Sequence, residues 1–189
     1  MSCNLDVELI KNNAKLGAQI AVQYCKTKEE IKPTVGCGRK ITIIGGAAVD
    51  IISQSNSIQK GSSNSHVGTI TMNEGGSTRN LAECLGRLGL AHDVTFISAV
   101  GDDDKQQMIV NSLQRVGIST AGLCVKHGAR TAAFTGVLDK HGDFFCGVAD
   151  MDVLEFIPKT HLEAFKFWES EIVILDSNIG SETLKYVLS

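Results

Sequence analysis

The stretch that decides the fold is residues 74–89, EGGSTRNLAECLGRLG, in which two glycines open a helix-forming run. Gly75 and Gly76 carry no side chains, so a ligand can approach the backbone there, and the free N–H groups of a helix's first turn can donate to its oxygens. Asn80 adds a carboxamide, which offers two donors and an acceptor to the hydroxyls of a sugar. The same spacing also fits an ordinary turn followed by a polar helix start, and both interpretations stay open on this pattern alone.

On either side of this segment, short β-rich runs alternate with helical stretches. The predicted strands are 41–44, 67–72, 94–100 and 172–175, and the first and last of them are expected to be buried. The predicted helices are 77–88, 106–116, one beginning near Pro158 with capping-box residues Thr160 and Glu163, and one from Ser181 onward. Such alternation predicts an α/β fold with a mainly parallel sheet. The runs 132–138 and 144–148 flank a turn-like DKHGD and predict a β-arm. We expect the sheet to be cut off part-way, because the chain stops at Ser189 soon after a helix start.

Composition limits the class of function. The chain has 189 residues with 18 Lys+Arg and 21 Asp+Glu, a net charge of −3, so the basic surface that nucleic acid needs is missing. No apolar run reaches membrane-spanning length and no signal peptide opens the chain, which together predict no membrane partner and a cytoplasmic location. The six cysteines form neither a metal-binding pattern nor a disulfide framework.

Asp50 is a further candidate site residue. It follows the predicted strand 41–44 and a Gly-Gly-Ala-Ala-Val run, near the strand's carboxyl end, where ligands of open α/β sheets bind. Its carboxylate can accept from two neighbouring hydroxyls, although a turn or capping aspartate fits equally well. The sequence contains no phosphate-binding loop, dinucleotide fingerprint or nucleophile elbow.

The glycine–helix segment resembles the N-terminal signature of the ribokinase (PfkB) family of sugar and nucleoside kinases. The order of motifs agrees, with Asp50 first, then the glycine pair and Asn80, then a Ser-Ala-Val-Gly-Asp run and the β-arm. The resemblance covers residues 40–189. It implies the N-terminal half of a ribokinase-like fold, an α/β sheet with flanking helices and a β-arm lid, and it implies that Asp50, Gly75, Gly76 and Asn80 bind the substrate.

Within that family the chain is most similar to pseudouridine kinases. The matching pieces are Arg79-Asn80, Asp150-Met151 and Asp176-Ser177-Asn178, and the resemblance adds Asp150, Asp176 and Asn178 to the substrate-binding residues. Many relatives have Asn two positions before the strand-end Asp, where this chain has Ala48. Residues 7–21 resemble the last helix of pseudouridine-5′-phosphate glycosidases. We therefore expect residues 1–26 to match the end of such a domain and residues 27–39 to be a linker, as in bifunctional pseudouridine-degrading proteins.

The resemblance implies a reaction, namely ATP-dependent phosphorylation of a sugar or nucleoside hydroxyl, with pseudouridine as the leading substrate and Mg²⁺ as a second cofactor in the full-length protein. The family's catalytic base and phosphate-binding backbone lie in a Gly-Ala-Gly-Asp-type segment, which this sequence does not contain. No catalytic or metal-binding residue is therefore assigned, no cofactor is assigned to this chain itself, and we expect it to be an incomplete copy that is inactive alone. A non-catalytic binding or regulatory chain, and a kinase for ribose or another nucleoside, are the alternatives. Homo-oligomers through the β-arm are a further expectation.

Overall fold

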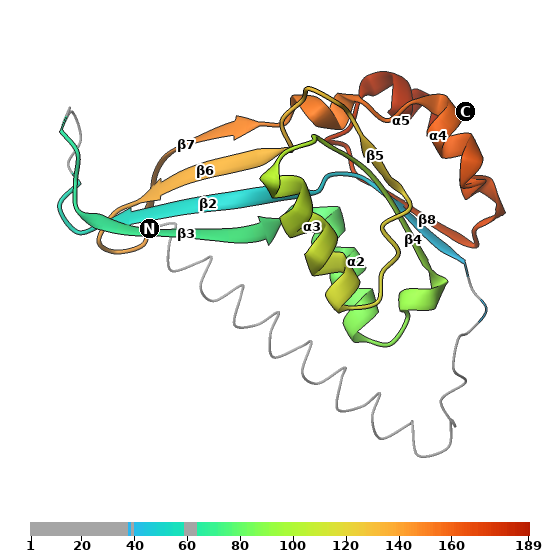
Figure 1. The fold of residues 1–189 in the computed structure, drawn as a ribbon, viewed down its shortest axis with the longest axis horizontal. Helices are drawn as coiled ribbons and strands as arrows, with labels where there is room; N and C mark the ends of the chain where they lie inside the picture. The colour runs from blue at the N-terminus through green and yellow to red at the C-terminus, as the bar shows by residue number, and fades with distance from the viewer. Residues whose placement is uncertain (1–37, 39, 59–63) are drawn as a thin grey trace, which may run out of the picture. The chain divides into compact units, whose positions relative to one another are not determined.

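Two four-stranded sheets form the framework of the part of the chain that the computed structural model describes, residues 38, 40–58 and 64–189 (Figure 1). The first, which we call the body sheet, has the strand order β5-β4-β1-β8, and all its neighbouring strands run parallel. Its strands are β5 (Leu123–Val125), β4 (Val94–Val100), β1 (Ile41–Ile44) and β8 (Ile172–Leu175). The central strands β1 and β4 are largely buried, which is typical of parallel strands with both faces covered.

Helices cover both faces of the body sheet. They are α2 (Ser77–Arg87), α3 (Asp104–Arg115), α4 (Lys159–Ala164) and α5 (Ser181–Leu188), with short 3-10 turns η1 (Ala91–Asp93), η2 (Asp152–Glu155) and η3 (Phe167–Glu169). Consecutive side chains of a strand point to opposite faces. Ile43 and Phe96 therefore enter a core with residues of α2 and α3, whereas Ile44 and Ile97 enter a second core with residues of η2, α4 and α5. Figure 1 shows the two helix pairs on the two sides of the sheet.

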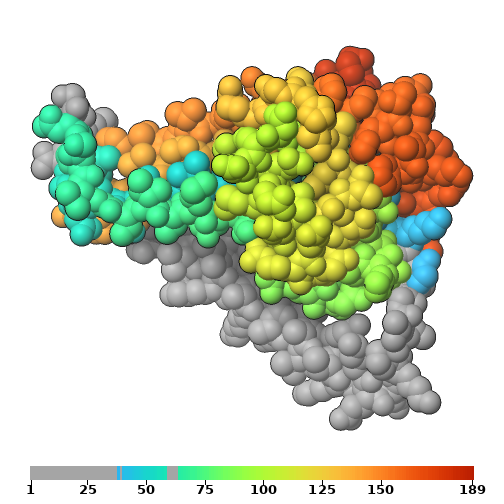
Figure 2. Space-filling view, viewed as in Figure 1, coloured from blue at the N-terminus to red at the C-terminus, as the bar shows by residue number. Residues whose placement is uncertain are grey.

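The second sheet, which we call the arm, projects from this body (Figure 2). Its strand order is β3 (Gly68–Gly75), β2 (Ala48–Ser55), β6 (Ala133–Leu138) and β7 (Phe144–Asp150). The outer pairs β2·β3 and β6·β7 are antiparallel, and the two pairs are joined by parallel pairing of β2 with β6. Most side chains of β3 and β7 are exposed, because no helix of the described residues covers the outer part of the arm.

Most predicted elements of the body are confirmed. The observed β1 and β4 have the bounds of the predicted strands, and α2 and α3 begin and end within two residues of the predicted helices. Strand β8 is present, but its predicted burial is wrong: Ile172 is 44% exposed, because β8 has a neighbouring strand on only one side. The predicted capping box of α4 is also wrong, since Pro158 is the N-cap residue and Thr160 lies inside the helix without capping it.

The arm is larger than the predicted hairpin. The two strands β6 and β7 form that hairpin around the turn 139–143, as expected. Strand β2 was not predicted, and Asp50 is its third residue instead of lying in a loop. The predicted run 67–72 becomes the longer β3, which pairs with β2 over all eight residues.

The predicted helix over residues 1–26 lies outside the described residues, and of the predicted linker over residues 27–39 only Gly38 is described. Both stay predictions. Among the helices of the described residues, none has the length and apolar character that a membrane crossing requires.

Candidate functional site

A cavity of about 640 Å³ lies where the arm meets the carboxyl ends of β1 and β8. This is the edge at which ligands bind in open α/β sheets. Strand β2 and the β1–β2 connection contribute one wall, the start of α2 a second, and the segment after β8 a third. The lining residues are Gly46, Ala48, Asp50, Gly76, Ser77, Phe134, Ala149, Met151, Leu154, Glu155, Asp176, Ser177, Asn178 and Ile179.

Asp50 and the glycine pair are packed against each other. A Cβ atom added to Gly75 would collide with the carboxylate oxygens of Asp50, so a larger residue there would displace this carboxylate. Gly76 is the N-cap of α2 with a φ of 95°, a conformation that favours glycine, and a Cβ there would collide with the carbonyl of Gly46. Both glycines thus let the β3–α2 turn pack closely on the β1–β2 segment, with Asp50 held at the cavity wall.

The start of α2 is tied to both neighbouring strands of the body sheet. Thr78 Oγ1 donates to the carbonyl of Gly46 at 2.9 Å, just after β1. Ser77 Oγ donates to Asp176 Oδ2 at 3.0 Å, and the backbone N–H of Asn178 donates to Asp176 Oδ1 at 3.0 Å. No side chain caps α2 and no acidic side chain lies in its first turn. The positive end of this helix therefore faces the cavity edge without a fixed carboxylate of its own.

The charge of the cavity wall has one sign. Asp50, Asp176 and Glu155 bring three carboxylates to it, and no Lys or Arg is among the described residues that line it. Carboxylates accept hydrogen bonds from hydroxyl groups and repel anions. The wall therefore suits a neutral ligand rich in hydroxyl groups better than a phosphorylated one.

A profile of the family described as pfkB family carbohydrate kinase matches residues 39–185. The chain belongs to this family. Curated relatives include an uncharacterised sugar kinase, YeiI, of Escherichia coli (strain K12), 28% identical over 149 residues, and the pseudouridine kinase of the same organism, 26% identical over 150 residues. Each alignment covers 78% of this chain, with 40% and 47% of the respective relatives. The chain thus spans less than half the length of these relatives.

Solved structures show the same fold. The ribokinase of Giardia lamblia superposes with a TM-score of 0.68 at 21% identity, covering 79% of this chain and 49% of the ribokinase chain. The ribokinase of Arabidopsis thaliana, solved with ribose and ATP, superposes with a TM-score of 0.64 at 19% identity, covering 75% of this chain and 46% of that one. The body sheet, its flanking helices and the arm therefore match about half of the ribokinase-like α/β fold, as the resemblance implied.

The structure brings four of the seven predicted site residues of this pfkB-family chain together at the cavity. Those four are Asp50, Gly76, Asp176 and Asn178. Gly75 lies directly behind Asp50 and is not itself part of the lining.

Asn80 and Asp150 lie elsewhere. Asn80 accepts from Arg79 through Oδ1, and Asp150 Oδ2 accepts from Arg130 Nε at 2.7 Å beside a separate small depression. The Arg130 guanidinium has its pKa raised by that hydrogen bond and by the charge of Asp150. Because an arginine already pairs with Asp150 outside the cavity, the substrate-binding role of Asp150 stays a prediction that the cavity does not by itself favour.

Sequence reasoning missed several lining residues. Ser77 could have been found, because it directly follows the glycine pair at a helix start. Phe134 and Glu155 carry no local signal, since they reach the cavity only through the pairing of β6 with β2 and the position of η2 after the arm. Ala48 also lines the cavity, so the position where many relatives have Asn presents a methyl group.

Ribokinase-like kinases use ATP, whose phosphate groups pair with cationic side chains or a metal ion. Among residues 38, 40–58 and 64–189, no group of three or more His, Cys, Asp or Glu side chains is arranged to hold a metal ion. The lining residues fit a phosphoryl acceptor, because they offer hydrogen-bond acceptors and no cationic partner for phosphate.

Proposed function

We propose that this chain binds the acceptor of a phosphoryl transfer, a neutral sugar or nucleoside whose hydroxyl group is phosphorylated by the full-length kinase. The observation that carries the proposal is the cavity at the carboxyl ends of β1 and β8, with the Asp50 side chain in its wall, packed against Gly75. A carboxylate held there can accept from two adjacent hydroxyls of a furanose ring, which positions the ring for transfer.

Pseudouridine is the substrate that we propose first. It carries no negative charge for the three carboxylates of the wall to repel, and it combines a ribose with a flat base. Phe134 lies in the lining and stacks on Phe144 with ring centroids 6.2 Å apart, so the arm offers an aromatic surface to such a base. The 26% identity to a pseudouridine kinase and the Arg79-Asn80 pair support this choice. Ribose and other nucleosides are the competing acceptors.

In the full-length kinase we propose ATP as the phosphoryl donor, with Mg²⁺ beside its phosphates. Phosphoryl transfer depends on positioning and on neutralising the transferred charge. This chain's residues would supply the positioning on the acceptor side. They would bind and orient the sugar, and the arm would exclude water above it. The repulsion between three wall carboxylates and a new phosphate group would favour release of the product.

The proposal is tested by calorimetric titration of the 189-residue chain with pseudouridine, uridine, ribose and pseudouridine 5′-phosphate. We expect pseudouridine to bind and its 5′-phosphate to bind at least about tenfold more weakly. The Asp50→Asn variant should lose about tenfold or more in affinity for pseudouridine, because the amide replaces one of the two acceptor oxygens and the charge. Asp143→Asn, in the exposed turn of the arm, is the matched control and should bind like the unchanged chain. Equal binding by Asp50→Asn would contradict the site assignment.

We also propose that the arm joins two copies of the chain. The supporting observation is the apolar side chains exposed on one arm face, among them Ile70, Met72 and Val148. Paired residues share a face, which places Met72 beside Ile51, Ile70 beside Ser53, and Val148 beside Thr135 of the same face.

A further inference from the structure

Arg79 lies in an unfavourable place for a positive charge. Its side chain is 4% exposed, and it is the third residue of α2, in the first turn, where the helix dipole is itself positive. Burial of a guanidinium is costly unless hydrogen bonds and an opposite charge compensate it. Glu83 is the carboxylate that meets it, and Glu83 also pairs with the exposed Arg87.

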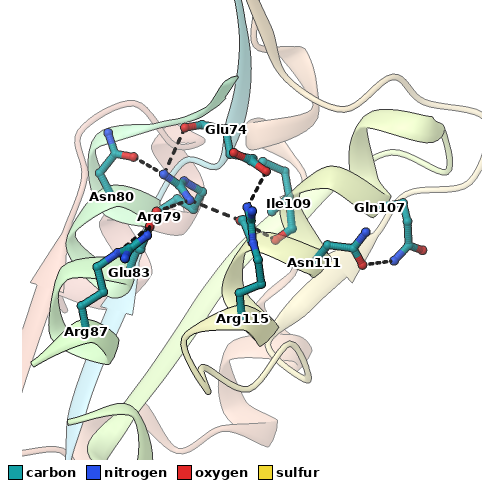
Figure 3. A network of polar contacts seen from close by, with 10 residues as sticks. Glu74, Arg79, Asn80, Glu83, Arg87, Gln107, Ile109, Asn111 and Arg115 are labelled. Atoms are coloured by element: carbon teal, nitrogen blue, oxygen red, sulfur yellow. Dashed lines mark hydrogen bonds and ion pairs between the residues drawn. The ribbon is translucent and has the colours of Figure 1, made fainter. Parts of the chain in front are cut away.

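The guanidinium of Arg79 joins α2 to two other elements (Figure 3). Nη1 donates to Glu83 Oε2 at 2.7 Å and to Ser112 Oγ of α3 at 3.2 Å. Nη2 donates to the backbone carbonyl of Glu74 in β3 at 3.0 Å and to Oδ1 of Asn80. Nε is buried and has no hydrogen-bond partner among the described residues.

The two partners of Nη2 stand on either side of the glycine pair. Glu74 immediately precedes Gly75 and Gly76, and Asn80 follows them by four residues, so one nitrogen closes the segment 74–80 into a loop. Within this loop Gly75 packs against Asp50, and Gly76 lies in the cavity wall. A shift of this nitrogen would therefore move the wall that carries the acceptor site.

The same contact fixes the Asn80 carboxamide. Since Oδ1 faces Arg79, the NH₂ group points away from the guanidinium, as Figure 3 shows. The side chain of Asn80 is exposed, and no hydrogen bond of Nδ2 to a described residue accompanies the contact of Oδ1. Its two N–H donors are thus oriented before any ligand arrives, which lowers the entropy lost on binding.

We propose that Arg79 is a positioning residue: it presents the NH₂ group of Asn80 as a donor to an oxygen of the acceptor and holds the glycine turn against Asp50. The donor complements the wall carboxylates, because a nucleoside carries ring, hydroxyl and carbonyl oxygens that accept hydrogen bonds. The proposal rests on the proposed function, since the acceptor must bind at this site. Asn80 does not itself line the cavity, but it follows Ser77, which does, by three residues of α2, so the two side chains share one face of the helix.

Two substitutions of Asn80 separate the donor from the contact with Arg79. Asn80→Asp keeps an oxygen for Nη2 and adds a carboxylate next to a buried cation, so this variant should melt no lower than the unchanged chain. It lacks the NH₂ donor and should bind pseudouridine about tenfold more weakly. Asn80→Ala should bind as weakly and melt at a lower temperature. Unchanged pseudouridine affinity in Asn80→Asp overturns the donor role, and a lower melting temperature overturns the contact with Arg79.

Arg79→Lys tests the positioning, with Arg87→Gln as the matched control on the exposed side of Glu83. Lysine cannot reproduce the two-sided fork of the guanidinium. In NMR spectra of the ¹⁵N-labelled chain, the two side-chain N–H signals of Asn80 are assigned by their loss in Asn80→Asp. These signals should shift in Arg79→Lys and keep their position in Arg87→Gln. Pseudouridine affinity should fall about three- to tenfold in Arg79→Lys, and by a smaller factor when the same change is made in the Asn80→Ala background, where only the contact with the glycine turn is left to lose. Asn80 signals that do not shift, or two losses that simply add, would overturn the proposal.

The two proposals fail in different ways. If none of the tested sugars or nucleosides binds the unchanged chain, the proposed function fails, and the Asn80 side-chain amide signals still decide whether Arg79 positions Asn80. The opposite outcome is that pseudouridine binds, that Asp50→Asn lowers its affinity, and that the Asn80 side-chain amide signals shift neither on adding ligand nor in Arg79→Lys. The proposed function would then stand, and the positioning role of Arg79 would be wrong.

Discussion

The body sheet and the arm contain similar apolar residues in opposite surroundings. Phe96 of β4 is 1% exposed between two helices and its neighbouring strands, whereas Phe144 of β7 is 63% exposed. The body is an ordinary three-layer core, in which apolar side chains stabilise the fold by leaving water. The arm keeps such side chains in water, on long strands held mainly by backbone pairing. Apolar content alone therefore does not identify the core. Exposed apolar strands, like those of the arm, point to an interaction.

The two sheets are joined where the candidate site lies. The chain passes between body and arm at the β1–β2 connection, at the glycine pair, before β6 and after β7. Hydrogen bonds fix several of these crossings. Thr78 Oγ1 donates to the carbonyl of Gly46, and the backbone N–H of Thr131 donates to Asp103 Oδ2. The cavity therefore lies at the boundary between the packed body and the exposed arm. In this position the arm suits the role of a lid over a bound ligand.

The largest expected effect comes from making the same substitution in both sheets. Phe96→Ala removes a fully buried ring and should lower the free energy of unfolding by about 3–5 kcal/mol. Phe144→Ala removes an exposed ring whose described partner ring is Phe134, and should cost less than about 1 kcal/mol. Urea unfolding of both variants at 25 °C and pH 7 measures the difference. Equal losses would mean that the arm is as buried in solution as the body.

A smaller effect is expected at the crossing before β6, where Asp103 joins the body to the arm. Asp103 is the N-cap of α3: Oδ1 accepts from the N–H of Gln106 at 3.2 Å and Oδ2 from the N–H of Thr131 at 3.1 Å. Burial raises the pKa of Asp103, but hydrogen bonds from Lys105, Thr131 and Gln106 outweigh it and lower the pKa from 3.8 to about 2. The lowered pKa means that the folded state favours the carboxylate, so its stabilisation is complete above about pH 4 and is lost as the pH falls toward 2.

Asp103→Asn should therefore lower the free energy of unfolding by about 2 kcal/mol at pH 7, and the difference from the unchanged chain should shrink between about pH 4 and pH 2. Urea unfolding at pH 7, 4 and 3 follows this decrease. Lys105→Met is the control, because it removes a partly exposed ion pair at 2.8 Å and leaves the two backbone donors in place. It should cost no more than about 1 kcal/mol. A difference for Asp103→Asn that stays constant over this pH range would show that its charge does not matter.

The sequence predicted the body better than the arm for a physical reason. Strands such as β1 and β4 are continuous apolar runs, because helices cover both of their faces, and such runs are visible in one sequence. Strand β2, with the sequence AVDIISQS, mixes apolar and polar residues and finds its partners 13 or more residues further along the chain, as for Ser55 with Gly68. Nothing local marks such a strand. The exposure of β8 at a sheet edge likewise depends on which strands lie beside it.

The candidate site was predictable where short-range chemistry defines it. Gly76 and Asp50 could be found because a glycine turn and a carboxylate near a strand end each have a local signature. Glu155 could not be found, since only the tertiary fold brings η2 to the cavity. Arg79 was visible in the sequence only as part of a motif, and its burial and its hold on Asn80 required the structure.

The smallest effect on folding, and the sharpest test of the arm, is expected from its exposed face. Ile70 is 72% exposed and Val148 71% exposed, so replacing both by Thr, which is also β-branched, should change the free energy of unfolding by less than about 0.5 kcal/mol. If two copies meet through this face, sedimentation of the unchanged chain should show a concentration-dependent dimer that the double variant lacks. Val67→Thr is the control, because Val67 is 92% exposed but precedes β3. A dimer that survives Ile70→Thr with Val148→Thr would contradict the proposed contact, because these side chains lie on the arm face opposite to Asp50 and Phe134 and do not line the cavity.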